Sequence, residues 1–408
     1  MRNALKFLCL LALALLALML TQLRGVLPVD REALVAEKYG GWSGVLRVWA
    51  YEGWQWGAGS LTGWLNECAA SFERKHPGVY VQVSTVEAAA IRDFLTTGIN
   101  PPDAILFPPG LLNTEDGLAP VYEEFALREG LLQAGESEGE QFAVPVAMGL
   151  YAWAYNSAQL AAIPVDWRHT DAAAICYESG EHRCWGAALL SLCTGMYPPE
   201  TEDARREGEA PGIDLGLRPQ NPTPAPTPTP MPDPDRLRPC VLNDQFSFSE
   251  AAYSAFVRGE AAAMVVTQRE IYRLQALSDS GKAPDWRVAF TGETVFTDQL
   301  AMFATVSGER PHGEQRQALC QQLLTHLLSE TCQSSLAKRG VFSVLDAHAL
   351  YSSGAMAEIE TAAAGAKIFA PNVFSNGWRG FSEKIVRDFL DGVRSANDSM
   401  AYLVDIST

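Results

Sequence analysis

Strand-like and helix-like patterns alternate between residues 45 and 107, and this alternation constrains the fold more than any other feature. Apolar runs rich in β-branched and aromatic residues predict strands, whereas apolar residues at a spacing of three and four predict helices. The predicted order is strand 45–50, a helix from 61 that stops near 76–78, strand 79–84, helix 91–97 and strand 103–107. Such an order predicts a mainly parallel sheet with right-handed crossovers, and therefore an α/β fold.

The loops that follow these strands indicate where a ligand would bind. Parallel sheets bind ligands beyond the carboxyl ends of their strands. The loop 51–56 is rich in glycine and aromatic residues, and the segments 85–88 and 108–110 follow the other two strands. We therefore expect these three segments to surround one crevice.

The nearly uncharged segment 141–156 is predicted to join two parts of the fold. Apolar residues alternate with a period of two, as in a strand. Pro145 favours the start of a strand or an edge strand, because proline cannot donate a ladder hydrogen bond. We interpret the segment as a strand that leaves one globular lobe and enters a second, with the boundary at Met148 to Tyr151.

A proline-rich tract interrupts the pattern between residues 195 and 240. Proline occupies every second position from 222 to 234. Such a tract forms extended, solvated polyproline II structure and builds no core. We interpret 195–240 as a flexible insertion in a surface loop. The alternative is a linker between two independent domains.

The N-terminus carries an export signal. Arg2 and Lys6 flank the start of an uncharged apolar run from Phe7 to Leu20, which is typical of a signal peptide. The run is also nearly long enough to span a bilayer, so residues 1–29 are predicted to be a signal peptide or an uncleaved signal anchor. Both alternatives place the rest of the chain outside the cytoplasm, in the periplasm or at the cell surface.

Acidic residues outnumber basic ones by 48 to 31, for a net charge of −17. Nucleic-acid-binding proteins present a basic face to phosphates, so a nucleic-acid partner is not expected.

The eight cysteines are compatible with an oxidising compartment. Cys9 lies in the export signal, so an odd number remains and at least one thiol stays free. Cys320 and Cys332 could join two consecutive helices, and Cys68 lies on the apolar face of a helix, as expected of a buried thiol. The other disulfide candidates form a cluster with three pairings left open: Cys176, Cys184, Cys193 and Cys240.

Five short motifs follow one another along the chain. They read Phe72-Glu73-Arg74-Lys75-His76-Pro77-Gly78-Val79; Gly98-Ile99-Asn100-Pro101-Pro102-Asp103; Val144-Pro145 with Tyr155-Asn156 and Pro164-Val165-Asp166-Trp167; Phe256-Val257-Arg258-Gly259-Glu260-Ala261-Ala262-Ala263-Met264; and Leu327-Leu328-Ser329-Glu330-Thr331-Cys332-Gln333 with Gly340-Val341-Phe342-Ser343-Val344. In this order, after an export signal, they resemble the extracellular solute-binding proteins of bacterial ABC importers, in the maltose- and oligosaccharide-binding family. The resemblance runs from about 45 to 403, apart from the proline-rich insertion, and Ser343 stands where the family often has proline.

The resemblance implies a two-lobed periplasmic-binding-protein-like fold. Each lobe would be a mainly parallel sheet flanked by helices, and several strands would form the hinge. Lobe one would comprise 45–146 plus 298–343, and lobe two 147–297 plus 344–408. The resemblance implies that the protein captures a small solute between closing lobes and delivers it to the permease of an ABC transporter. A carbohydrate is the expected class of solute.

The resemblance also indicates which residues bind the ligand. Carbohydrates are bound by aromatic faces and by planar polar side chains. The residues that it places near the cleft are Tyr51, Glu52, Trp54, Trp56, Glu87, Tyr151, Gln268, Asn376 and Trp378. A packing role competes for each aromatic residue, and we expect Trp64, Trp153 and Tyr155 to belong to the core.

Other functions have weaker sequence support. A glycosidase needs two positioned carboxylates, and no motif marks such a pair; no Gly-x-Ser-x-Gly elbow and no glycine-rich phosphate loop occurs. We therefore predict no catalytic residue and no cofactor. The cluster Cys176, His182, Cys184 and Cys193 matches no familiar zinc spacing, so disulfides are preferred to a metal. The remaining alternatives are a membrane-tethered sensing ectodomain and a secreted carbohydrate-active enzyme.

Overall fold

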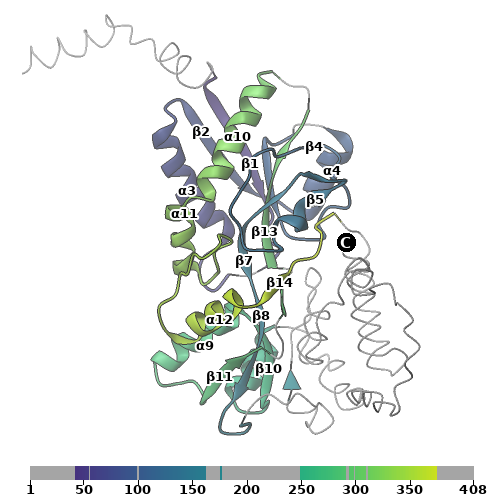
Figure 1. The fold of residues 1–408 in the computed structure, drawn as a ribbon. Coiled ribbons are helices and arrows are strands. Elements are labelled where there is room, and N and C mark those ends of the chain that lie inside the picture. The colour runs from purple at the N-terminus through teal and green to yellow at the C-terminus, as the bar shows by residue number, and fades with distance from the viewer. Residues whose placement is uncertain are drawn as a thin grey trace, which may run out of the picture.

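The computed structural model describes residues 42–54, 56–98, 101–161, 175–176, 249–290, 294–297, 299–308 and 311–374. The export signal 1–29, the insertion 195–240, Asn376 and Trp378 lie outside the described residues. Of the clustered cysteines, Cys176 is described in its backbone alone, and the other three lie outside. Figure 1 shows two lobes stacked end to end, with α3 and α10 in one and α9 and α12 in the other.

The sheet of lobe one contains the predicted parallel strands. Its order is β2-β1-β3-β13-β4, and β7 also pairs with β13. The strands are β1 (Gly44–Ala50), β2 (Val79–Thr85), β3 (Ala104–Phe107), β4 (Leu118–Ala119), β7 (Val144–Gly149) and β13 (Gln299–Val306). Strand β1 is parallel to both β2 and β3, as predicted, whereas β13 is antiparallel to its neighbours. The fold class is therefore confirmed as α/β, with a mixed sheet in this lobe.

Helices cover this sheet. They are α3 (Leu61–Lys75), α4 (Ala88–Thr97), α10 (Gly313–Leu327), α11 (Glu330–Ser334) and the 3-10 helix η5 (Ser335–Arg339). Ser60 caps the start of α3, and its side chain accepts a hydrogen bond from the Gly63 N–H, so one unpaired donor of the first turn is satisfied. Its apolar residues recur on one face, and Trp64 and Phe72 on that face are fully buried.

The sheet of lobe two has the order β11-β8-β10-β9. Its elements are β8 (Tyr151–Asn156), β9 (Ile175–Cys176), β10 (Ala263–Thr267), β11 (Trp286–Ala289), α8 (Ser249–Val257), α9 (Gln268–Asp279) and α12 (Gly354–Ala364). Strand β8 is antiparallel to β10 and β11. Trp153 and Tyr155 of β8 are buried, as is Trp64 of lobe one, so the predicted core role of these three aromatics is confirmed.

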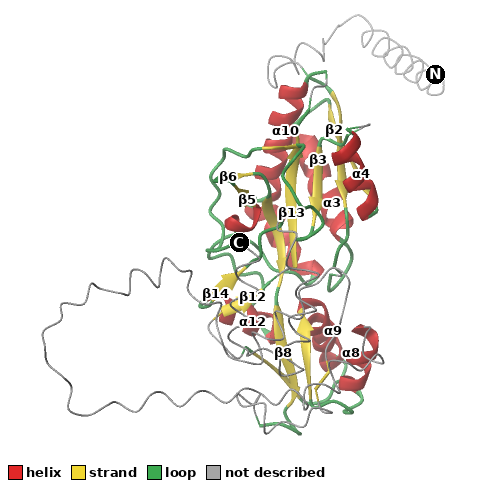
Figure 2. Ribbon diagram, turned by 90° about the vertical axis from the view of Figure 1, so that its right-hand side faces the viewer, coloured by secondary structure: helices red, strands yellow, loops and turns green. Residues whose placement is uncertain are grey.

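Short elements complete the described fold. They are η1 (Leu132–Gly135), β5 (Glu136–Ser137), β6 (Glu140–Gln141), β12 (Thr294–Phe296) and β14 (Lys367–Phe369). Strands β12 and β14 form a parallel pair, which lies at the waist between the lobes (Figure 2). Strand β14 follows α12 in the chain and β12 precedes β13, so the pair brings two distant chain segments to the waist.

The segment 141–156 crosses between the lobes as predicted. Strand β7 belongs to the sheet of lobe one and β8 to that of lobe two, with Leu150 alone between them. Among the described strands, β7 pairs with β13 alone, and the register shifts beside Met302, the partner of Pro145. On the other side of β7, Met148 forms an isolated bridge with Phe342. An edge strand tolerates the missing N–H of proline.

Candidate functional site

The loop after β1 meets the ends of two neighbouring strands. The Tyr51 N–H donates to the Leu106 carbonyl (2.9 Å) of β3, and the Val86 N–H donates to the Ala50 carbonyl (3.0 Å). Gly53 lies so close to Pro108 that an added Cβ would sit 2.2 Å from the proline Cγ. The three segments that the sequence placed around one crevice therefore converge at the carboxyl ends of the strands.

Two tryptophans of this loop are buried rather than exposed. Trp54 and Trp56 are 6% and 5% exposed, and their rings stack with centroids 5.5 Å apart. Trp56 also contacts Trp64 at 6.0 Å, and the Trp54 indole donates to the Leu300 carbonyl at 3.4 Å. The structure thus places both indoles in the core of lobe one in this conformation, and ligand contact by them stays a prediction.

The predicted polar residues of lobe one lie at helix starts. Glu52 is exposed and its carboxylate accepts a hydrogen bond from the Thr62 N–H (3.1 Å), in the first turn of α3. Glu87 is exposed at the N-cap of α4, where its side chain caps no N–H. A carboxylate beside a helix N-terminus interacts favourably with the helix dipole. Tyr51, the remaining candidate of this lobe, is half-buried.

Lobe two brings Tyr151 and Gln268 together at one end of its sheet. Tyr151 begins β8 and lies opposite Thr267, the last residue of β10, while Gln268 begins α9. Thr267 and Glu270 form a capping box, with the Thr267 N–H donating to the Glu270 carboxylate at 3.0 Å. Tyr151 is 2% exposed and Gln268 is fully buried, so both side chains are covered by protein here.

Tyr272 is a contact between the lobes that sequence reasoning missed. Its ring lies against two glycines of lobe one: an added Cβ on Gly57 or on Gly340 would sit 2.8 Å from ring atoms of Tyr272. Gly340 also has φ +65°, a conformation that favours glycine. Tyr272 lies one helical turn after Gln268 and thus shares its face of α9, a spacing that could have identified it.

Within the described ranges the chain crosses between the lobes at Leu150, at the β12–β13 connection and at 341–353. Gln333 of α11 ties two of these crossings together. Its amide donates to the carbonyl of Val146 (2.8 Å), and its carbonyl accepts from the Ser343 hydroxyl (2.9 Å) and the Val344 N–H (3.2 Å). Thr297, at the remaining crossing, donates its hydroxyl to the Gly149 carbonyl. The hinge is therefore a continuous hydrogen-bonded unit.

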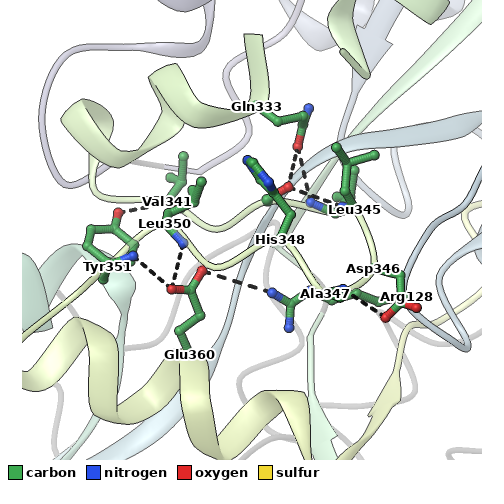
Figure 3. A network of polar contacts seen from close by, with 12 residues as sticks. Arg128, Gln333, Val341, Leu345, Asp346, Ala347, His348, Leu350, Tyr351 and Glu360 are labelled. Carbon is green, nitrogen blue, oxygen red and sulfur yellow. Dashed lines mark hydrogen bonds and ion pairs between the residues drawn. The ribbon is translucent and has the colours of Figure 1, made fainter. Parts of the chain in front are cut away.

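The third crossing is also held by a buried charge. Glu360 of α12 accepts hydrogen bonds from the N–H groups of Leu350 (2.8 Å) and Tyr351 (2.9 Å), and its other oxygen lies 3.9 Å from Arg128 of lobe one (Figure 3). The Arg128 N–H donates to the Val344 carbonyl (2.9 Å). Both charged side chains are less than one-tenth exposed. This network joins α12 to lobe one through the segment between them.

The predicted disulfide between Cys320 and Cys332 is wrong. Both thiols are free and buried, as is Cys68, whose predicted burial is confirmed. Cys320 points to the Asp103 carbonyl (3.6 Å), whereas Cys332 points to His326 (3.6 Å). Closeness along the chain suggested the pairing, but α10 and α11 direct these side chains to different neighbours.

The described residues were also compared with what a metal site and a membrane-spanning helix require. Among the residues that the structure describes, no three His, Cys, Asp or Glu side chains are grouped so as to hold a metal ion. Every described helix is too short or too polar to cross a bilayer.

Solved structures share this arrangement, although no protein-family model and no curated protein matches the sequence. The maltose-maltodextrin binding protein of Alicyclobacillus acidocaldarius superposes with a TM-score of 0.58 and 17% identity, covering 89% of this chain and 99% of that chain. The GacH receptor of Streptomyces glaucescens, solved without ligand and with acarbose, gives 0.56 and 17%, covering 89% and 97%.

A third similar structure is that of a sugar-binding protein of an ABC transporter. It is the galacto-N-biose- and lacto-N-biose I-binding protein of an ABC transporter from Bifidobacterium longum, with a TM-score of 0.55 and 11% identity over 90% of this chain and 95% of that chain. The chain has the fold of the sugar-binding proteins of ABC transporters. Because the matches span nearly the whole of each neighbour, both lobes of this fold are present. At such low identity the likeness concerns the fold, and ligand residues cannot be transferred from it.

Proposed function

We propose that this protein captures a carbohydrate-like solute between its two lobes and delivers it to the permease of an ABC transporter. The observation that carries the proposal is the meeting of two surfaces across the hinge: the aromatic loop 51–57 of lobe one and Tyr272 of lobe two. Aromatic faces are what a sugar-binding site needs. The solved proteins named above, which share the fold, bind maltose or maltodextrin, acarbose, and lacto-N-biose I, respectively.

The proposed site draws on both lobes. Lobe one contributes Tyr51, Glu52, Trp54, Trp56 and Glu87, and lobe two contributes Tyr151 and Gln268, to which we add Tyr272. Asn376 and Trp378 complete the set as residues outside the described part of the chain. Since Trp54, Trp56, Tyr151 and Gln268 are nearly covered here, their contact with a solute would require a rearrangement that uncovers these side chains.

Binding drives closure only if the solute prefers the closed form. A ligand with equal affinity for the open and closed forms shifts neither population, however tightly it binds. A site divided between the lobes meets this condition, because the solute contacts both halves only when they approach. The hinge bonds of Gln333 and Thr297 keep the lobes in register during this motion.

The proposed location is outside the cytoplasm, because residues 1–29 resemble a signal peptide or a signal anchor. Retention of the segment would tether the protein to the membrane beside its permease, and cleavage would release it. The solved neighbours are sugar-binding proteins, and accordingly we assign no reaction to this site.

Calorimetric titration and thermal unfolding with a solute panel test the proposal. The panel contains mono- and oligosaccharides, polyols, polyamines and metal ions. A solute at about a hundredfold its dissociation constant stabilises the folded state by about 2.7 kcal/mol, which raises the unfolding midpoint by several degrees. We expect a saturable shift with one class of sugar. A shift only with an amine or a metal ion would overturn the carbohydrate assignment.

Site variants then locate the binding surface. Tyr272→Ala is expected to weaken binding of the sugar about tenfold or more, because a desolvated aromatic contact is commonly worth more than 1 kcal/mol. Tyr80→Ala is the matched control, since this tyrosine is 62% exposed on β2 of lobe one. Equal affinity of Tyr272→Ala and the unchanged protein would place the site elsewhere.

A further inference from the structure

Two thiols of lobe one lie against each other in the core. Cys68 belongs to α3 and Cys332 to α11, and each is 3% exposed. Each of the two side chains shifts the pKa of the other, so they are close neighbours, although neither is part of a disulfide. The two residues are far apart in sequence, so only the fold brings them together.

Neighbouring contacts fix this juxtaposition independently. Trp64 lies one turn before Cys68 on the same face of α3, and its indole donates to the Cys332 carbonyl at 3.2 Å. Ser71 lies one turn after Cys68, and its hydroxyl is 2.5 Å from His326 Nε2. The same nitrogen lies 3.6 Å from the Cys332 sulfur. The face of α3 that carries Cys68 is thus packed directly on Cys332.

The surroundings favour thiolate formation at one of the two sulfurs. Interaction with the Cys68 side chain lowers the pKa of Cys332 to about 7 against the opposing effect of burial, and the hydroxyls of Ser329 and Ser71 and the charge of Lys75 act in the same direction as Cys68. Interaction with Cys332 and burial raise the pKa of Cys68. Since the thiolate is the attacking species in thiol–disulfide exchange, Cys332 is the nucleophile of the pair.

We propose that Cys68 and Cys332 are a redox pair that forms a buried disulfide between α3 and α11 when the protein meets a small-molecule disulfide. The Cys332 thiolate attacks one sulfur of that oxidant and releases one small thiol, leaving a mixed disulfide. The Cys68 thiol then loses its proton and attacks the Cys332 sulfur, which releases the second small thiol. Two protein thiols are thereby oxidised to one disulfide, and the oxidant is reduced to two thiols.

The position of the pair gives the disulfide a structural consequence. Gln333, which ties together two of the lobe crossings, directly follows Cys332. A disulfide would anchor α11, and with it the hinge, to the long helix α3. It would also close a chain segment of more than 200 residues, 69–331, and long closed segments restrict the unfolded chain strongly. This inference does not depend on the identity of the solute.

Refolding in a redox buffer tests the pair. The full chain is unfolded with a reductant and refolded in a mixture of oxidised and reduced glutathione, so that the buried thiols are accessible before the core forms. Free thiols are then alkylated and the peptides are mapped without reduction. We expect a peptide pair joined through Cys68 and Cys332, with Cys320 alkylated. Alkylation of both Cys68 and Cys332, or linkage of either to another cysteine, would overturn the proposal.

Thermal unfolding of matched variants adds an independent readout. The oxidised protein is expected to unfold at least about 5 °C higher than the reduced protein, given the length of the closed segment. Cys320→Ser should keep this redox-dependent difference, whereas Cys68→Ser should reduce it to the part contributed by disulfides among Cys176, Cys184, Cys193 and Cys240. A difference of the same size in Cys68→Ser would contradict the pairing. If Cys68→Ser does not fold, the peptide map of the unchanged chain decides.

Discussion

Single residues show how packing changes the meaning of a sequence pattern. Trp54 and Trp56 lie in a glycine-bearing loop, which favoured a ligand role, but the structure stacks them in the core with Trp64. Tyr272 carried no signal beyond its helical spacing from Gln268, because its two glycine neighbours come from distant parts of the chain. The neighbour of a cysteine likewise depends on the tertiary fold. Cys332 lies against Cys68 rather than against Cys320.

His326 provides a prediction about pH. Burial lowers the pKa of its imidazole below the ordinary value of 6.5, and the positive charges of Lys75, His76 and Arg74 act in the same direction. The unfolded chain therefore takes up a proton at a higher pH than the folded protein does. The contribution of the neutral His326 imidazole to the free energy of unfolding is complete above about pH 6.5. It is lost as the pH falls through the lower pKa of the folded state.

The corresponding measurement is denaturant unfolding at pH 7.5 and pH 5. We expect the unchanged protein to lose more free energy of unfolding between these values than His326→Asn, because the amide does not titrate. His348→Asn serves as a control on a half-buried histidine. Equal losses in His326→Asn and the unchanged protein would show that protonation of His326 does not contribute.

Gly57 allows a steric prediction at the contact between the lobes. An alanine Cβ there would lie 2.8 Å from Tyr272 Cγ and 3.0 Å from Gly340 Cα. Overpacking of this kind costs about 1–3 kcal/mol of the free energy of unfolding. At Gly365, by contrast, the nearest atom would be 3.9 Å away, so Gly365→Ala is the control. Unfolding of Gly57→Ala at the same denaturant concentration as the unchanged protein would contradict this contact.

At the scale of elements, sequence patterns predicted the strands and helices whose order is set by neighbouring parts of the chain. The parallel order of β1, β2 and β3 followed from alternating strand and helix patterns, and the crossing from β7 to β8 followed from the apolar run 141–156. Strands β12 and β14 escaped prediction, since each is short and pairs with a segment distant in the chain. Their pairing depends on how the lobes meet, which no local pattern encodes.

The segment between lobe one and α12 depends on Glu360. Burial lowers the pKa of Arg128, while the charge of Glu360 counteracts that effect, so the arginine relies on its carboxylate partner. Removal of one member of a buried ion pair typically costs about 3–5 kcal/mol. We expect Glu360→Ala to lose that much stability, because it also leaves the N–H groups of Leu350 and Tyr351 without their acceptor.

Two further variants separate the contribution of the hydrogen bonds that Glu360 accepts from that of its charge. Glu360→Gln retains an acceptor oxygen for both N–H groups and is expected to lose less stability than Glu360→Ala. Glu358→Gln, exposed on the same helix, should unfold within about 0.5 kcal/mol of the unchanged protein. Equal stability of Glu360→Ala and Glu358→Gln in urea unfolding would show that the network does not hold this segment.

At the scale of the whole molecule, the chain is two α/β lobes joined by a hydrogen-bonded hinge. The two-lobed fold predicted from the ordered motifs is confirmed by the sheets and by the solved structures that share it. The ligand residues stay a prediction, because a cleft residue and a core aromatic carry the same sequence pattern. The proposed closure on a solute therefore depends on how the two lobes assemble.

Small-angle X-ray scattering across the sugar panel tests this account most directly, because the lobes must approach when the solute binds. The account predicts that one class of sugar lowers the radius of gyration in a saturable manner, over the same concentration range as its calorimetric binding. A radius of gyration that stays constant while a sugar saturates the protein, or the absence of binding by every sugar, would contradict it.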